Sequence, residues 1–447
     1  MAGRVARVSR QAALAQLAER IRRKTARVGI IGLGYVGLPL AVEFAKQGFA
    51  VTGIDVDRQR VDRVNRAQSY IPDVPGDDLL RLVRQKRLQA TSGFEDLRSQ
   101  DAIIICVPTP LRKTREPDIS FILAAAKEIG RSLRRGQLIV LESTTYPGTT
   151  DEVILPMLQA GGLRAGKDFW LAFSPERIDP GNQRYTTRTI PKVVGGITPA
   201  CRRLAMTLYR RIVEQVVPVS STKVAEMVKL LENTFRAVNI GLVNEIALMC
   251  DKLGVEVWEV IDAAKTKPFG FLAFYPGPGI GGHCIPHDPM YLAWKARLHG
   301  AEARFIELAD QTNRAMPHYV VEKVARALND RRKPLNGSRI LLIGLAYKRD
   351  VNDTRDSPAF EIAQALREQG AVVSYHDPYV PSAELNGTLM QSVPLTARQL
   401  ARTDCVVILT NHSNVDYALV LAHAPLILDT RNQYGRAHRA DPRLKTL

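Results

Sequence analysis

Cys284 lies in a segment whose composition suits a reactive site. Residues 275–288 contain four glycines and three prolines around this thiol, and Asp288 follows it by four residues. Such a segment is expected to form neither regular helix nor strand, so it can bring backbone amides close to a ligand while the sulfur stays exposed. The pattern predicts a site built around a thiol beside a redox cofactor.

A helix is expected to begin directly after this segment. Asp288 and Pro289 have the form of an N-cap residue followed by proline at the first helical position. This structural role of Asp288 can coexist with a chemical one. A helix start just downstream would lend positive potential to Cys284, which would lower its thiol pKa and raise its nucleophilicity.

The histidines of the same segment raise the alternative of a metal site. His283, Cys284, His287 and Asp288 are all residue types that can bind metals. We expect no metal, because Pro286 should disrupt a helical presentation of these side chains and no second ligand cluster stands out.

The N-terminal part of the chain carries a glycine pattern typical of dinucleotide binding. An apolar strand expected at 27–31 is followed by Gly32, Gly34 and Gly37, and then by a helix from Pro39. In this pattern the first glycine permits a tight turn, the second lets the backbone approach a pyrophosphate, and the third allows close packing of helix on strand. The helix N-terminus would face the phosphates. The residues expected to bind the cofactor here are Gly32, Gly34, Tyr35, Val36 and Gly37.

An acidic residue at the end of the second expected strand completes the pattern. Asp55 lies 18 residues beyond Gly37. From there its carboxylate would accept hydrogen bonds from the adenosine ribose and repel a 2′-phosphate, which favours NAD over NADP. The alternative is that Asp55 merely caps a strand end.

Further strands continue the alternation of strand and helix, and we expect them at 102–107, 137–141 and near 169–173. Polar residues follow these strands, and the carboxyl ends of strands are where open α/β sheets bind ligands. Pro108, Thr109 and Thr144 are therefore candidates for the cofactor site, and Glu176 is a candidate for the substrate site. Alternatively, Ser and Thr there cap the next helix, and Glu176 is a surface carboxylate.

A long helix is expected from Val224 over about thirty residues. It is apolar on nearly all faces, so it should be buried. Lys229 and Asn233 are four residues apart and project from one side, which suits an active-site amine and amide, although a snorkelling lysine on a solvated face is the alternative. One domain would struggle to cover this helix, so we expect a homodimer or a higher homo-oligomer formed through it.

A second α/β region follows a polar linker at 331–337. Its strands are expected at 339–347, 371–375, 405–409 and 426–428, with a helix at 358–369. The region lacks the glycine pattern and instead has Lys348 and Arg355 after its first strand and Arg431 after its last expected strand. Basic side chains in place of glycine amides imply a second phosphate-bearing ligand that is not another NAD.

Composition and charge narrow the class of protein. The chain has 447 residues and a net charge of +17, and its basic residues are scattered, which favours solvated helices and phosphate ligands over a nucleic-acid groove. Five dispersed cysteines indicate a reducing compartment, and no apolar stretch reaches the roughly 20 residues of a membrane span. We expect a cytoplasmic protein without membrane insertion, whose residues 1–24 form a basic helical extension.

Together these motifs resemble the UDP-sugar 6-dehydrogenase family from about Arg27 to Tyr434. The shared features are the glycine run at 32–37, Pro-Thr-Pro at 108–110, Glu-Ser-Thr at 142–144, Ser-Pro-Glu at 174–176, Lys229 with Asn233, Gly-Gly-x-Cys at 281–284 with Asp288, and Lys348 with Arg355. The segments 174–182 and 267–286 look like the branch that acts on UDP-N-acetylhexosamines, particularly UDP-N-acetylglucosamine. The UDP-glucose branch usually has Lys where His287 stands.

The resemblance implies two successive oxidations of a sugar C6 alcohol to a carboxylate, with two NAD⁺ reduced, in the biosynthesis of a polysaccharide such as O-antigen or capsule. Cys284 would capture the aldehyde as a thiohemiacetal, which is oxidised to a thioester and hydrolysed. Lys229 would stabilise alkoxide charge, Asp288 would handle protons or water, and Asn233 and Glu176 would position substrate or water. The base of the first step stays open. The implied substrate-binding residues are Glu176, Lys229, Asn233, Gly281, Lys348, Arg355 and Arg431.

The implied fold is α/β, with two Rossmann-like doubly wound domains joined by a long central helix and a helical dimerisation domain. We expect an extension at 1–24, an NAD-binding domain at 25–218, a central helical domain with the Cys284 loop at 219–335, and a UDP-binding domain at 336–447.

Oxidation of UDP-N-acetylglucosamine to UDP-N-acetylglucosaminuronate is the expected reaction, with UDP-N-acetylmannosamine or UDP-glucose as alternative substrates. A relative of the β-hydroxyacid dehydrogenases is a more distant alternative. Such a protein needs neither the Cys284 loop nor the α/β region that follows residue 337, and it releases one NADH per substrate instead of two. A basic nucleic-acid-binding protein is another, and it would show salt-dependent DNA retention without NAD binding.

Overall fold

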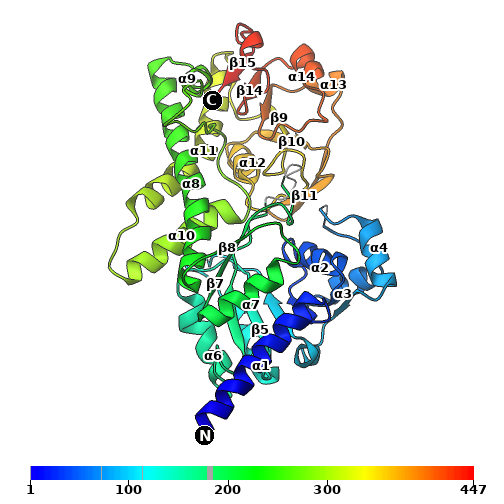
Figure 1. The fold of residues 1–447 in the computed structure, drawn as a ribbon. Helices are drawn as coiled ribbons and strands as arrows, with labels where there is room; N and C mark the ends of the chain where they lie inside the picture. The colour runs from blue at the N-terminus through cyan, green and yellow to red at the C-terminus, as the bar shows by residue number, and fades with distance from the viewer. Residues whose placement is uncertain (1, 72, 113, 179–184) are drawn as a thin grey trace. The chain divides into compact units, whose positions relative to one another are not determined.

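The computed structural model describes residues 2–71, 73–112, 114–178 and 185–447, and for residues 2–11 it describes the backbone alone. The chain divides into two compact units. Unit 1 comprises residues 1–232 and 294–299, and unit 2 comprises residues 233–293 and 300–447 (Figure 1).

Unit 1 is built on a mostly parallel sheet. Its strands are β1 (Arg27–Ile31), β2 (Ala50–Ile54), β3 (Leu88–Thr91), β4 (Ala102–Ile105), β5 (Leu138–Leu141), β6 (Trp170–Phe173), β7 (Lys192–Gly196) and β8 (Val216–Pro218). Over the described residues their order is β3-β2-β1-β4-β5-β6-β7-β8, and β6 and β7 pair antiparallel. The order through β6 is that of a doubly wound dinucleotide-binding domain, as the sequence predicted.

Helices cover the sheet of unit 1 on both faces. They are α1 (Ala2–Arg22), α2 (Gly37–Lys46), α3 (Arg58–Asn65), α4 (Gly76–Arg84), α5 (Ser120–Ser132), α6 (Leu155–Gln159) and α7 (Pro199–Tyr209), with a 3₁₀ turn at Glu95–Ser99 and a π-helical turn at Thr149–Ile154. Successive residues of a strand point to opposite faces, so Ile104 packs in one apolar core and Ile103 and Ile105 pack in the other.

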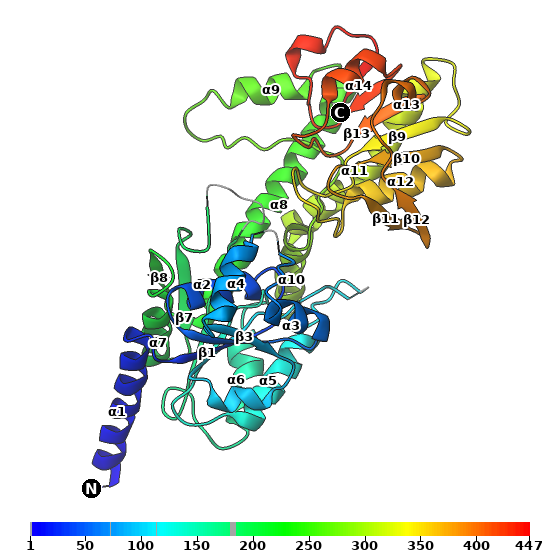
Figure 2. The same ribbon diagram turned by 90° about the vertical axis from the view of Figure 1, so that its right-hand side faces the viewer.

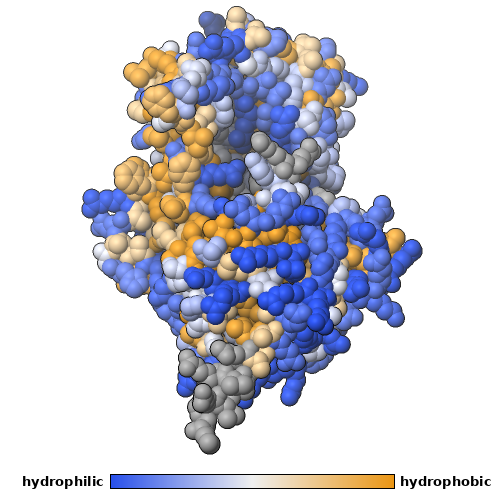
Figure 3. All heavy atoms as spheres, in the orientation of Figure 1, coloured by the Kyte–Doolittle hydropathy of each residue, from blue (hydrophilic) through white to orange (hydrophobic). Residues whose placement is uncertain are grey.

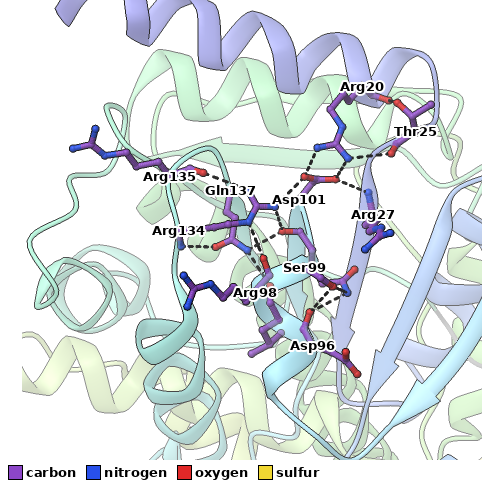
Figure 4. A network of polar contacts seen from close by, with 12 residues as sticks. Arg20, Thr25, Arg27, Asp96, Arg98, Ser99, Asp101, Arg134, Arg135 and Gln137 are labelled. Atoms are coloured by element: carbon purple, nitrogen blue, oxygen red, sulfur yellow. Dashed lines mark hydrogen bonds and ion pairs between the residues drawn. The ribbon is translucent and has the colours of Figure 1, made fainter.

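The N-terminal helix α1 is part of this domain, and not simply an extension from it. Its residues 2–22 are helical, as predicted, and Leu17 and Ile21 are buried in the main core. Figure 2 shows the C-terminal end of α1 leading into β1 beside α7. At this end Arg20 and Arg134 both reach the carboxylate of Asp101, at 2.6 and 3.1 Å (Figure 4). The carboxylate thus joins α1 to the start of β4.

Unit 2 contains a second parallel sheet. Its strands are β9 (Arg339–Ile343), β10 (Val372–His376), β13 (Cys405–Ile408), β14 (Ile427–Asp429) and β15 (Leu444–Thr446), and β11 (Ser382–Leu385) and β12 (Thr388–Gln391) form a separate hairpin. As far as the chain is described, the order is β10-β9-β13-β14-β15, which is again doubly wound. The first strand ends at Ile343 instead of the expected 347, because Gly344 turns the chain with a φ of +88°.

The helices of unit 2 and of the middle of the chain complete the fold. They are α8 (Thr222–Leu253), α9 (Val257–Ala264), α10 (Cys284–Leu298), α11 (Arg304–Asn329), α12 (Pro358–Glu368), α13 (Ala397–Ala401) and α14 (Tyr417–His423). The long helix α8 begins in unit 1 and ends in unit 2. Within the described ranges, every helix is too short or too polar to span a lipid bilayer.

The expectation that α8 is buried on nearly all faces is wrong for a single chain. Leu231, Phe235 and Leu242 are 58, 50 and 55 % exposed. Figure 3 shows hydrophobic side chains gathered over the face on which Figure 1 places α8 and α9. Apolar residues on all sides of a helix imply burial only where another element covers each side, and no described element covers this stripe.

Candidate active site

The glycine turn after β1 has the shape that a dinucleotide requires. Gly32 has a φ of +92°, and a Cβ there would lie 2.4 Å from the carbonyl oxygen of Cys106. A Cβ on Gly37 would lie 1.8 Å from the carbonyl oxygen of Gly32, whereas a Cβ on Gly34 would meet no described atom within 4 Å. The first and third glycines are therefore needed for packing, and the space over Gly34 can take a pyrophosphate. Tyr35 and Val36 lie in the same turn, directly before α2.

Asp55 shapes this turn from the end of β2. It is buried, its Oδ2 accepts a hydrogen bond from the Leu33 amide at 2.8 Å, and its Oδ1 accepts one from the Asp57 amide at 2.9 Å. The carboxylate therefore has a local structural role beyond the end of its own strand. Ribose binding by Asp55 stays a prediction.

The other predicted cofactor residues follow strands at the same edge of the sheet. Thr109 is buried after β4, Pro108 is exposed, and Thr144 is half-buried after β5. The Val107 amide donates a 2.8 Å hydrogen bond to Ser143 Oγ, which ties the ends of β4 and β5 together. Because β1 and β4 are the neighbours at which the strand order reverses, this edge is where a doubly wound sheet binds its ligand.

Glu176 is not the surface carboxylate that the sequence allowed as an alternative. It is 8 % exposed, and its Oε2 lies 2.8 Å from Lys192 Nζ. Its Oε1 accepts hydrogen bonds from the amides of Arg177 and Ile178 at 2.6 and 2.7 Å. Burial alone would raise the pKa of Glu176, but the charge of Lys192 and these hydrogen bonds hold it well below its ordinary value. Glu176 is therefore a fixed anion.

Sequence reasoning missed the partners of Glu176. Lys192 also binds the buried carboxylate of Glu142, to which the Tyr209 hydroxyl donates a hydrogen bond. Burial raises the pKa of Glu142 above its ordinary value. The sequence did contain a signal for these residues, because each is a charged residue at one terminus of a buried strand. Glu142 directly follows β5, and Lys192 is the first residue of β7. Residues 179–182 of the motif that follows Glu176 lie outside the described residues.

Lys229 lies on α8 and is 8 % exposed, so it is not on a solvated face. One turn earlier, the buried Glu226 accepts hydrogen bonds from the Gly148 amide at 2.6 Å and from the Thr150 amide at 2.9 Å. Burial raises the pKa of Glu226 to about 7. Glu226, which sequence reasoning also missed, fixes the start of α8 to unit 1 and so fixes the position of Lys229.

In unit 2, Cys284 is the first residue of α10 and its side chain is exposed. The expected helix start after Asp288 is therefore wrong, and Asp288 is not an N-cap. Proline is tolerated in a first helical turn, where its missing N–H would have no intrahelical partner, so Pro286 does not block the helix. The helix N-terminus thus lies at the thiol itself, which strengthens the expected effect on its reactivity.

Asp288 is buried in the second turn of α10 and accepts a hydrogen bond from the side-chain amide of Asn233. The structure thus brings together two predicted site residues that are far apart in sequence. Among the described residues, no group of three or more His, Cys, Asp or Glu side chains is arranged to hold a metal ion.

The glycines before Cys284 let the chain pack closely on the loop that follows β9. A Cβ on Gly281 would lie 2.5 Å from Tyr347 Cβ, and a Cβ on Gly282 would lie 2.8 Å from Tyr347 Cε2. The Gly282 amide also donates a 2.9 Å hydrogen bond to the Arg355 carbonyl. Gly281, predicted as a substrate residue, therefore has a packing role in this structure.

The predicted phosphate-binding residues of unit 2 lie at the ends of β9 and β14. Lys348 is half-buried, and Arg355 is 46 % exposed and forms a two-pronged ion pair with Asp353, at 2.6 Å for the shorter contact. Arg431 donates a 2.7 Å hydrogen bond from Nε to the Leu409 carbonyl, and desolvation lowers the pKa of Arg431 to about 10. Arg355 and Arg431 are therefore already held by protein groups.

A buried pair that the sequence did not reveal holds this loop. Asp377, at the end of β10, accepts hydrogen bonds from the Leu345 and Ala346 amides at 2.7 and 3.0 Å. His412 Nε2 lies 3.1 Å from the same carboxylate, and the Asp350 amide donates to His412 Nδ1 at 3.0 Å. The neutral tautomer with its proton on Nε2 satisfies both contacts.

A dinucleotide-binding domain, a long central helix, an exposed thiol at a helix start and a second doubly wound domain together have the organisation of a nucleotide-sugar dehydrogenase. Profiles of the UDP-glucose/GDP-mannose dehydrogenase family match the chain in three parts, with the NAD binding domain at residues 26–213, the central domain at 223–315 and the UDP binding domain at 341–436. The chain belongs to this family, as the sequence predicted. It uses NAD and is an oxidoreductase of UDP-sugars.

Several of the similar proteins bear names of enzymes for N-acetylated sugars. The chain is 38 % identical to a UDP-N-acetyl-D-glucosamine 6-dehydrogenase of Pseudomonas aeruginosa over 81 % of this chain and 84 % of the relative. It is 36 % identical to an NDP-N-acetyl-D-galactosaminuronic acid dehydrogenase of Ralstonia solanacearum, over 86 and 90 %. The solved structure of a UDP-D-ManNAc dehydrogenase from Pyrococcus horikoshii matches with a TM-score of 0.85 at 32 % identity, over 94 and 98 %.

The family membership supports a nucleotide-sugar dehydrogenase over the two distant alternatives, a β-hydroxyacid dehydrogenase relative and a nucleic-acid-binding protein. It does not select one sugar, because the similar proteins are named for different hexosamines.

Proposed function

We propose that this enzyme oxidises the C6 hydroxyl of a UDP-N-acetylhexosamine, and specifically UDP-N-acetylglucosamine, to a carboxylate in two successive steps. The observation that carries the proposal is the exposed thiol of Cys284 at the first residue of α10, packed beside the loop after β9 within one compact unit. A nucleophile beside a nucleotide-binding loop suits a sugar whose diphosphate end is held there. The names of the similar proteins support an N-acetylated sugar.

NAD accepts a hydride from the substrate carbon in each oxidation. Between the two steps, Cys284 Sγ adds to the C6 aldehyde and forms a thiohemiacetal, which keeps one C–H bond for the second oxidation. The second oxidation gives a thioester, water then breaks the C–S bond, and the carboxylate and the thiol are released. Splitting the conversion in this way keeps the aldehyde from escaping.

The remaining predicted residues have roles that fit their surroundings. Asp288 is buried and bound by Asn233, so it can orient or deprotonate the hydrolytic water. Lys229 supplies positive charge for a developing alkoxide. Glu176 is held as an anion by Lys192, which suits positioning of the substrate better than proton transfer.

The diphosphate end of the substrate falls to the basic residues of unit 2. Lys348, Arg355 and Arg431 follow strands at the edge of the second sheet where ligands bind. Arg355 and Arg431 are positioned by protein contacts, so little of their side-chain freedom would be lost on binding.

A panel of UDP-hexoses tests the proposal. We expect the highest kcat/KM with UDP-N-acetylglucosamine and two NADH per sugar consumed. UDP-N-acetylmannosamine, UDP-N-acetylgalactosamine and UDP-glucose serve as competing substrates. One NADH per sugar in the unaltered enzyme would contradict the four-electron reaction, and a higher kcat/KM for UDP-glucose would contradict the sugar assignment.

The exposed stripe of α8 favours a homodimer or a higher homo-oligomer. Leu231, Phe235 and Leu242 recur at helical spacing, and apolar residues in contiguous patches mark interfaces. Replacement of Phe235 and Leu242 by Asp should yield a smaller species in analytical ultracentrifugation, while Asp at the exposed Leu389 of the β11–β12 hairpin should not.

The cellular setting follows from the same proposal. Four free cysteines, Cys106, Cys201, Cys250 and Cys405, are buried, which suits a reducing cytoplasm. There the enzyme would supply a nucleotide-linked aminouronic acid for an O-antigen or a capsule.

A further inference from the structure

His287 connects two segments that the proposed function assigns to different tasks. It lies on α10, one turn after Cys284, and its Nε2 is 3.2 Å from Asp356 Oδ2. Asp356 ends the loop that follows β9, directly after Arg355. The contact thus joins the helix start that carries the nucleophile to the loop that carries basic residues for the diphosphate.

The chemistry of the His287 ring fixes the direction of this contact. Its Nδ1 is buried and has no hydrogen-bond partner among the residues that the structure describes. A proton on Nδ1 would leave a buried donor unsatisfied, so the neutral ring carries its proton on Nε2 and donates it to Asp356. The orientation of the ring therefore depends on this carboxylate.

His283 supports the same orientation without competing for the carboxylate. The rings of His283 and His287 pack edge to face with their centroids 4.8 Å apart. Burial lowers the pKa of His283 to about 4, so this ring is neutral near pH 7. It fills the space behind His287 and carries no charge that would draw Asp356 away.

The carboxylate is held in place by its backbone. Asp356 has a φ of +47°, a conformation that Asp, Asn and Gly tolerate better than other residues. The preceding carbonyl of Arg355 accepts the hydrogen bond from the Gly282 amide. One backbone and one side-chain hydrogen bond therefore join the two segments on either side of Cys284.

We propose that His287 and Asp356 are a positioning pair that sets Cys284 Sγ relative to the diphosphate-binding loop, so that the aldehyde is captured before it leaves. The inference rests on the two-step oxidation proposed above. A shift of about 1 Å between reacting groups can slow a reaction by roughly a hundredfold. Because the Asp356 carboxylate is 51 % exposed, loss of its contact with His287 should disturb this geometry far more than the folding of the protein.

The number of NADH released per sugar reports whether Cys284 captures the aldehyde. Capture forms the S–C bond, opens the carbonyl and moves the thiol proton to its oxygen. The second oxidation would then remove the C–H hydrogen of C6 as a hydride, with bound NAD⁺ as the acceptor, and release the hydroxyl proton. When capture fails, the aldehyde leaves after one oxidation. The number of NADH per sugar then falls from two towards one, and free aldehyde reacts with an aminooxy probe.

The variants to compare are His287→Leu, which removes the hydrogen bond, and His287→Gln, whose amide can still donate to Asp356. Asp356→Gly and Asp356→Asn form a second set that tolerates the φ of +47° and differs in the acceptor. His318→Leu is the matched control, because the His318 side chain is 68 % exposed and pairs at 3.5 Å with a different carboxylate, that of Glu361 on α12. Circular dichroism would verify that each variant is folded.

For His287→Leu and Asp356→Gly we expect about one NADH per sugar, trapped aldehyde and a roughly tenfold lower rate of acid formation, with the KM for NAD unchanged. His287→Gln, Asp356→Asn and the control should stay near two NADH. Two NADH and no aldehyde from a folded Asp356→Gly would overturn the inference, even if His287→Leu failed to fold. One NADH from the unaltered enzyme would instead overturn the proposed function and the inference with it.

Discussion

The two doubly wound domains begin with the same turn and then use it differently. Gly32 after β1 and Gly344 after β9 have φ angles of +92° and +88°, and each is followed by an amide that donates to an aspartate at the end of the neighbouring strand. These aspartates are Asp55 and Asp377. In unit 1 the turn leads directly into α2, so the helix N-terminus can face phosphates.

In unit 2 the helix is delayed. After Gly344 a long loop intervenes, and α12 begins only at Pro358. The loop carries Lys348 and Arg355, and it packs against the segment that ends in Cys284. In the proposed function, the first turn binds a phosphate with backbone amides and the second with charged side chains, and the longer loop of the second also packs against the segment that carries Cys284.

Removal of the Cys284 thiol should have the largest effect on catalysis, and it leaves both turns intact. Cys284→Ser should lower overall turnover by at least about a thousandfold, since an alcohol is a far poorer nucleophile than a thiolate. Steady-state NADH release measures this loss. Iodoacetamide should label Cys284 in the folded enzyme and spare the four buried cysteines. Near-normal turnover of the serine variant would exclude the covalent route.

The paired aspartates test whether the two turns serve different ligands. Asp55→Ala should raise the KM for NAD and relax the preference over NADP, and Asp377→Ala should raise the KM for the UDP-sugar. Asp377→Ala also takes the acceptor from the amides of Leu345, Ala346, Tyr379 and Val380, which should lower the free energy of unfolding by at least about 1–3 kcal/mol. If either variant changed both KM values equally, the assignment of NAD to the first turn and of the UDP-sugar to the second would be wrong.

Acid unfolding sharpens the same test. Burial opposes ionisation of Asp377, but the hydrogen bonds from His412 and Ala346 hold its pKa below the ordinary value of 3.8. A carboxylate with a lowered pKa stabilises the fold fully above its ordinary pKa and loses this stabilisation as the pH falls. The difference in the free energy of unfolding between the unaltered enzyme and Asp377→Ala should therefore become smaller below about pH 4.

The glycines separate ligand space from packing space. Gly34→Val should raise the KM for NAD by roughly tenfold without changing the melting temperature, because a Cβ at this position would have no described atom within 4 Å. Gly344→Ala should instead destabilise the protein by about 1–3 kcal/mol, because of its positive φ. A lower melting temperature for Gly34→Val would show that this space belongs to the fold.

His412 should give the smallest effect. His412→Asn can still accept the Asp350 amide, and His412→Gln can still reach Asp377, so each should cost about 0.5–1.5 kcal/mol of unfolding free energy. His412→Leu should cost more than either. Thermal melts that rank the leucine variant as the most stable of the three would contradict the proposed double contact.

Local signals allowed much of this fold to be predicted. The buried strands, the glycine turn with Asp55 and the long helix all follow from short patterns of apolar residues, and Cys284 stands out by composition. Contacts between distant segments have no such pattern. Lys192 with Glu142, and His412 with Asp377, became visible only when the strands had been placed side by side.

Two errors have separate physical causes. The start of α10 was placed too late because Asp288 and Pro289 have the form of an N-cap and a first helical proline, whereas both lie inside the helix. The burial of α8 in the single chain was overestimated because a sequence pattern shows which faces of a helix are apolar, but not whether another element covers them.

The N-terminal helix has a practical consequence for anyone who shortens this protein. A version trimmed to begin at the glycine motif would lose Leu17 and Ile21 from the main core and Arg20 from Asp101. The apolar side chains that pack against α1, including those of α7, would then face water. Asp101 would keep its ion pair with Arg134 but lose the one with Arg20. Such a version should aggregate and be cleaved readily by proteases, even though all its proposed catalytic residues are present.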